Sequence, residues 1–150
     1  MSTINDGFIA AFRKYAQRVH ELAAPLDETQ FRTRPYPYGN SFCHLVLHLT
    51  GNLNYYIGAQ MGETGYIRHR DLEFTDPHPP AKAEVLARFD AAINMVIATV
   101  ETQTDADWAL AYEAVGAGGC RNRLEITMQC AAHLYHHIGQ MIYLQREWTK

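Results

Sequence analysis

The sequence of 150 residues lacks the features of several protein classes. It has 13 basic and 16 acidic residues, a net charge of -3, and no cluster of lysine or arginine that would follow a phosphate backbone. No apolar run approaches the roughly 18 residues of a membrane span, and the first residues lack the pattern of a signal peptide. We therefore expect a cytoplasmic protein with no nucleic-acid partner and no membrane segment.

Cysteine is also scarce. The three cysteines, Cys43, Cys120 and Cys130, are odd in number and have no Cys-x-x-Cys spacing, so neither a disulfide framework nor a zinc ribbon is indicated. We interpret Cys43 and Cys130 as small buried residues within helices. Histidine, by contrast, is abundant: eight residues in this length point towards metal or proton chemistry.

No run of residues predicts a convincing β-strand, whereas four long stretches have apolar residues at spacings of three and four. They cover residues 4–24, 42–58, 81–103 and 124–147. Each stretch predicts an amphipathic helix, and four such helices can bury one another only as a bundle. A chain of this length forms one domain, so we predict a single all-α four-helix bundle over residues 1–150.

The connections between these helices differ in composition. Residues 27–40 are rich in proline and are expected to be non-helical. Residues 66–80 read as a polar loop, and residues 104–123 as a loop with a short extended piece at 109–112. The last two connections are about 20 residues long, enough to cross the bundle, so a simple up-down-up-down order is not required.

Two histidines of the last predicted helix, His133 and His137, stand four residues apart. This spacing directs both imidazoles to one face, with Cβ atoms roughly 6 Å apart. A divalent metal bound by neutral imidazole needs a third protein ligand, which one helix cannot supply from the same side. We place that ligand at His48, in phase with the apolar stripe of the second helix. The three histidines suit zinc, nickel, iron or copper and leave a coordination position open.

Other interpretations of these histidines stay open. His44 lies one turn before His48, so a closed four-histidine site, better suited to a structural ion, is conceivable. A histidine on an apolar helix face is also commonly a core residue whose nitrogens are hydrogen-bonded without any metal. His136 is rotated about 100° from its neighbours and is expected to face outward or pack on another helix.

The order of these motifs resembles the DinB/YfiT-like superfamily of metal-binding four-helix bundles. The likeness covers residues 5–147 and is carried by Asn40-Ser41, His48-Leu49 with Gly51-Asn52-Leu53, Arg70-Asp71-x-Glu73-Phe74 and His133-x-x-x-His137-x-Gly139-Gln140. The resemblance implies that His48, His133 and His137 bind one divalent metal, usually zinc or nickel. It also implies homodimers and long crossovers between helices.

The superfamily includes thiol transferases that act with bacillithiol or mycothiol, but residues 70–74 resemble a subgroup of unassigned function. A metal held by three neutral imidazoles keeps its double charge and lowers the pKa of a bound water or thiol. Our leading hypothesis is therefore a thiol S-transferase or hydrolase, acting on a small electrophile with water or a low-molecular-weight thiol. The alternative is a non-catalytic metal-binding or dimerisation module, or a sensor.

Several further residues are candidates for supporting roles. Tyr55, Tyr56 and Glu73 are candidate proton-handling groups, although a tyrosine in phase with the core stripe, as Tyr56 is, more often serves packing than chemistry. Arg70, Asp71 and Glu73 also fit an exposed salt bridge in a loop. We further expect Gly139 to allow a close approach of helices and Gln140 to hydrogen-bond a ligand imidazole.

Overall fold

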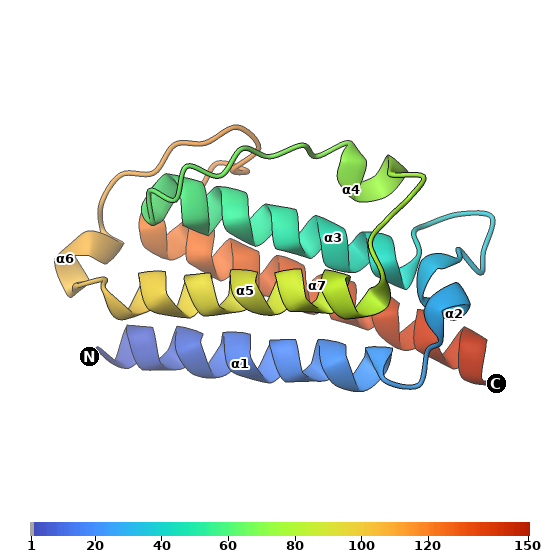
Figure 1. The fold of residues 1–150 in the computed structure, drawn as a ribbon. Coiled ribbons are helices and arrows are strands. Elements are labelled where there is room, and N and C mark those ends of the chain that lie inside the picture. The colour runs from blue at the N-terminus through green and yellow to red at the C-terminus, as the bar shows by residue number, and fades with distance from the viewer. Residues whose placement is uncertain (1) are drawn as a thin grey trace.

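The computed structural model describes residues 2–150, and four long helices run side by side in it (Figure 1). They are α1 (Thr3–Ala23), α3 (Phe42–Leu53), α5 (Lys82–Glu101) and α7 (Arg123–Thr149). α3 continues into a π-helical stretch, η1 (Asn54–Ala59). No strand occurs among the described residues, so the predicted all-α bundle is confirmed. Within the same part of the chain, no helix has both the length and the apolar character needed to cross a membrane.

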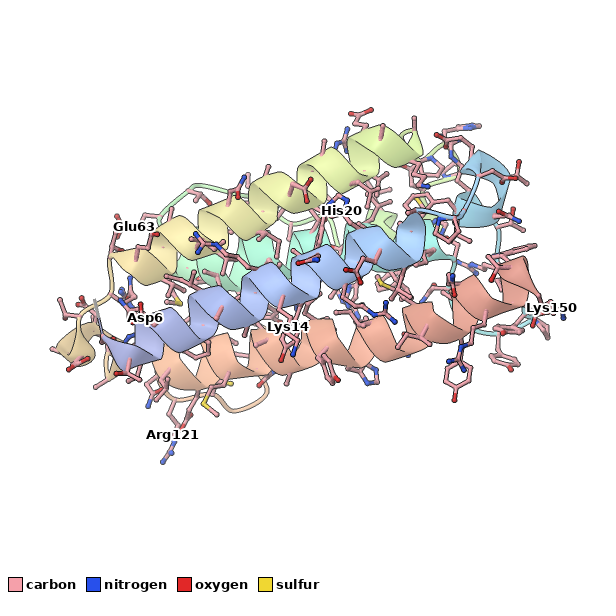
Figure 2. The ribbon with its side chains drawn as sticks, turned by 90° about the horizontal axis from the view of Figure 1, so that it is seen from below. Asp6, Lys14, His20, Glu63, Arg121 and Lys150 are labelled. Atoms are coloured by element: carbon pink, nitrogen blue, oxygen red, sulfur yellow. The ribbon has the colours of Figure 1, made fainter. Side chains whose placement is uncertain are left out.

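Each long helix packs against two others. α1 contacts α5 and α7, and α3 contacts the same two helices. Figure 2 shows α1 lying between α5 and α7. The apolar stripes that the sequence predicted face one another across this arrangement and form one continuous core. Its fully buried side chains include Phe12, Val19, Phe42, Leu49, Phe89, Val96, Leu134 and Met141.

The two long connections follow different paths. Residues 62–81 run back along the bundle, so that α3 and α5 point the same way, opposite to α1 and α7 (Figure 1). The second connection starts and ends at the same end of the bundle. This second connection does not cross the bundle but folds over η1. There the Tyr112 hydroxyl donates a hydrogen bond to the Tyr56 carbonyl at 2.8 Å. The extended piece expected at residues 109–112 is a single antiparallel bridge between Ala111 and Asn122.

Three short helices lie in segments that the sequence predicted to be non-helical. They are α2 (Glu28–Arg32), α4 (Leu72–Thr75) and α6 (Asp105–Trp108). α2 and α6 begin with capping boxes, formed by Asp27 with Gln30 and by Thr104 with Asp107. Such reciprocal hydrogen bonds stabilise a single turn that has no room for apolar periodicity, which is why the prediction was wrong there.

Candidate metal centre

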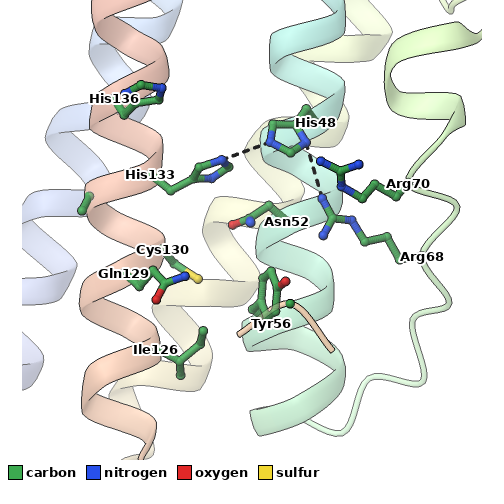
Figure 3. A pocket seen from close by; sticks show the side chains of 12 residues that line it. His48, Asn52, Tyr56, Arg68, Arg70, Ile126, Gln129, Cys130, His133 and His136 are labelled. Carbon is green, nitrogen blue, oxygen red and sulfur yellow. Dashed lines mark hydrogen bonds between the residues drawn. The ribbon is translucent and has the colours of Figure 1, made fainter. Parts of the chain in front are cut away.

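Three histidine side chains from two helices converge on one point. His133 and His137 lie one turn apart on α7, and His48 reaches them from α3. The Nε2 atom of His133 lies 3.0 Å from Nε2 of His48 and 3.0 Å from Nε2 of His137. One ligand atom from each residue lies within 4.8 Å of the other two. Figure 3 shows His48 and His133 facing each other between the two helices. The structure thus brings together the three side chains that the sequence analysis named as candidate metal ligands.

Hydrogen bonds among the rings do not account for this arrangement. Nδ1 of His48 lies 3.0 Å from a Glu73 oxygen, and Nδ1 of His137 lies 2.8 Å from the Gln140 carbonyl oxygen. Both oxygens only accept, so each Nδ1 is the donor, and in the neutral form of such a ring Nε2 carries the lone pair. The Nε2 lone pairs of both rings therefore point at Nε2 of His133, which has at most one proton to offer. A shared cation satisfies all three lone pairs.

The distances fit such a cation. Metal–nitrogen bonds to histidine are about 2.0–2.1 Å, so two ligands on one tetrahedral or octahedral ion lie about 2.9–3.4 Å apart. Both close Nε2 pairs, at 3.0 Å, fall in that range. The group of His48, His133 and His137 can therefore hold a metal ion.

The protonation states fit as well. Burial, together with the neighbouring His137 and His48 rings, lowers the pKa of His133 to about 3. Burial also lowers the pKa of His137 to about 4, partly opposed by its hydrogen bond to Gln140. Both rings are therefore neutral at pH 7, the form in which imidazole binds metals.

Glu73 lies behind His48 and is held by a buried arginine. Arg68 donates from Nε and Nη2 to the two carboxylate oxygens of Glu73, each at 2.8 Å. The two side chains are only 10% and 8% exposed. Burial would raise the pKa of Glu73, but the hydrogen bonds from His48 and Arg68 outweigh it and lower that pKa. An ionised Glu73 therefore fixes the orientation of His48 and makes its ring a better ligand.

Gly51 provides the space that Glu73 occupies. A Cβ atom at Gly51 would overlap Oε2 of Glu73. Any larger residue at position 51 would therefore push the Glu73 carboxylate away from His48.

Comparisons with known proteins agree with this fold. The sequence profile of the DinB superfamily matches residues 11–141. The chain belongs to the DinB superfamily. A crystal structure of a conserved protein from Enterococcus faecalis is similar, with a TM-score of 0.78, 98% of each chain covered and 14% sequence identity. At that identity the likeness shows the fold alone. A search of curated proteins finds no match.

In this DinB-superfamily chain, the prediction that Arg70, Asp71 and Glu73 form an exposed salt bridge is wrong. Glu73 pairs with Arg68, not with Arg70, because the turn of α4 directs its carboxylate inward. Arg70 instead lies with its guanidinium 5.3 Å from the centre of the Phe74 ring. Arg68 was not among the candidate residues, since no fixed spacing joins a loop arginine to its partner. The only signal was the need of a buried carboxylate for a nearby positive charge.

The two predictions for the end of the α7 motif have different outcomes. Gln140 hydrogen-bonds the His137 ring, as expected. Gly139 does not mediate close helix packing, since a Cβ built there meets nothing within 4 Å among the described residues. His136 is exposed, as expected for its position on the helix.

The remaining candidates lie outside the histidine cluster. The Tyr56 hydroxyl donates to the Val115 carbonyl at 3.0 Å, and Tyr55 packs with its ring centre 4.9 Å from that of Tyr56. His44 lies with Nδ1 2.6 Å from the Ser41 hydroxyl and is not part of the cluster. The structure therefore offers three histidines, not four, for a shared ion.

Proposed function

We propose that this protein is a metal-dependent enzyme in which His48, His133 and His137 bind one divalent cation, zinc or nickel. When bound, the cation supplies the charge that lowers the pKa of a thiol or water into the neutral range for attack on a small electrophile. The observation that carries the proposal is the convergence of three imidazoles, in which Nε2 of His133 lies 3.0 Å from Nε2 of His48 and 3.0 Å from Nε2 of His137.

The number of ligands supports a reactive site over a structural one. Structural zinc sites usually close the coordination sphere with four protein ligands, whereas catalytic sites use three and leave a position for water or substrate. A cavity of about 460 Å³ reaches His48 and His133, which gives a small molecule access to that position. In this proposal Glu73 and Gln140 keep the rings in place, and the cavity admits the reactants.

The proposal extends to a low-molecular-weight thiol as cosubstrate and to a homodimer in the cytoplasm. The family resemblance implies thiol chemistry and dimers, and the three cysteines are free, as is usual in a reducing compartment. Sedimentation of the protein with and without metal tests the dimer and also exposes a sensor in which metal binding changes the association.

Metal content is the first test. After expression and purification without chelator, elemental analysis should find about one zinc or nickel ion per chain. His137→Ala should lose the ion, because only two protein ligands remain. The matched control is His136→Ala, which removes an exposed neighbouring ring and should retain the metal. Absence of stoichiometric metal in the unaltered protein overturns the proposal.

Metal removal then separates an enzyme from a structural module. If the chelated protein keeps a cooperative melting transition, the ion is not required for folding, and a screen of thiols with electrophiles should show metal-dependent turnover. If chelation unfolds the protein outright, the ion is structural and the catalytic proposal fails.

A further inference from the structure

The cavity beside the histidine cluster is lined by residues that the metal site itself does not use. It has a volume of about 460 Å³, within the range of small-molecule sites. α3 and η1 form one wall, α7 the opposite wall, and residues 68–70 of the connection from η1 to α5 close one side (Figure 3). Apart from His48, His133 and His136, its side chains include Asn52, Tyr56, Arg68, Arg70, Ile126, Gln129 and Cys130.

The charge of this lining has one sign. No aspartate or glutamate lines the cavity, whereas two arginines do. Arg68 uses Nε and Nη2 for Glu73, which leaves Nη1 outside that ion pair. Arg70 has no acidic partner among the described residues and rests on the Phe74 ring. Figure 3 shows both guanidinium groups beside His48. Guanidinium groups bind carboxylates with paired hydrogen bonds, so this wall favours an anion.

Asn52 supplies an independent sign that a ligand belongs here. It lies one turn after His48 on α3 and is only 8% exposed. Its side-chain oxygen is buried and makes no hydrogen bond within residues 2–150. Figure 3 shows this side chain between His48 and Tyr56, directed across the cavity towards α7. Buried polar atoms without partners are rare in proteins, and one that lines a cavity has its partner supplied from the cavity, by water, an ion or a bound molecule.

We propose that this cavity binds a small organic carboxylate next to the histidine cluster. Arg70 and the free edge of Arg68 hold the carboxylate, Asn52 hydrogen-bonds a polar group of the same molecule, and Tyr56 and Ile126 contact its apolar part. As a statement about the substrate, this inference rests on the proposed function. The binding step itself needs only residues of the chain, so it is testable without metal.

The test uses chelator-treated protein, because a carboxylate would also bind a metal directly. Three acids, benzoate, phenylacetate and 4-phenylbutyrate, are each compared with their uncharged amides by NMR titration. We expect at least one acid to bind about tenfold more tightly than its amide, the gain typical of a charge-assisted hydrogen bond. Arg70→Gln should remove about fivefold to tenfold of that preference.

Two further variants test whether acid binding depends on the charge of the cavity itself. Lys14→Gln removes the same charge from α1, which lies on the opposite side of the bundle from the crossover (Figure 1). Lys14 does not line the cavity, so this variant should leave acid binding unchanged. Asn52→Asp places a negative charge in the cavity and should abolish the preference for acids, provided that its melting curve stays cooperative. The proposal is overturned if no acid binds, if acids and amides bind equally, or if Arg70→Gln and Lys14→Gln behave alike. Acid binding by a protein that never takes up metal would refute the proposed function alone.

Discussion

The histidines of α3 and α7 face the same point but are held there in different ways. His48 is 6% exposed, and its Nδ1 donates to a carboxylate that a buried arginine clamps from behind. On α7, His137 donates to an exposed amide, and Nδ1 of His133 has no hydrogen-bond partner among the described residues. The α3 side therefore depends on residues 68–73 of the crossover, whereas the α7 side depends mainly on the spacing of its own helix.

This difference predicts where the candidate site is sensitive. The pair on α7 is aligned by backbone hydrogen bonds that any stable helix provides. The ring on α3 is aligned by an ion pair whose partners both lie outside α3, and a buried ion pair is costly to leave half complete. Changes in the crossover should therefore weaken metal binding more than changes beside the α7 pair, although neither set replaces a ligand.

Glu73→Gln should have the largest effect of these changes. It leaves the buried Arg68 guanidinium without a counter-charge, which costs about 3–5 kcal/mol of unfolding free energy. For a domain of this size each kcal/mol lowers the melting temperature by about 2–4 °C. Loss of the carboxylate behind His48 should also lower metal affinity by about 10–100-fold. Thermal melts and titration against a competing chelator measure the two effects.

The control for Glu73→Gln is the same substitution in an exposed pair. Glu84 bonds Arg88 on the surface of α5, where both side chains are about half exposed. Glu84→Gln should change stability by less than about 0.5 kcal/mol and leave metal binding intact. Equal effects of the two substitutions would show that the buried pair does not support the site.

Gly51→Ala should have the next largest effect, because the added Cβ would overlap the Glu73 carboxylate. Alanine in place of glycine normally stabilises a helix interior by roughly 0.5–1 kcal/mol. Here the overlap should reverse the sign, at a net cost of about 1–2 kcal/mol, with weaker metal binding as Glu73 moves. Gly7→Ala on α1 is the matched control, since nothing lies within 4 Å of its built Cβ. It should raise the melting temperature, and a similar rise for Gly51→Ala would contradict the role assigned to Glu73.

The sequence predicted the parts of this molecule that follow from periodicity. The four long helices and the pairing of His133 with His137 follow from spacings of three and four residues. His48 could be nominated because it shares the phase of an apolar stripe. The ion pair of Arg68 with Glu73 could not be predicted in this way. Its geometry is set by the path of a loop across the bundle, which no local sequence pattern encodes. The short helices α2 and α6 were missed for a related reason, because capping hydrogen bonds define them.

Gln140→Ala should have the smallest effect and tests the α7 side of the comparison. The hydrogen bond from His137 to Gln140 lies at the surface, so water can replace the lost amide oxygen at little cost. Metal affinity should fall by no more than about tenfold, the lower limit for a group that orients a ligand, and the melting temperature should stay unchanged. Titration against a chelator, run beside Glu73→Gln, gives the ratio of the two effects. If Gln140→Ala lost as much affinity as Glu73→Gln, helix spacing alone would not align the α7 pair, and both sides of the cluster would depend equally on their hydrogen-bond partners.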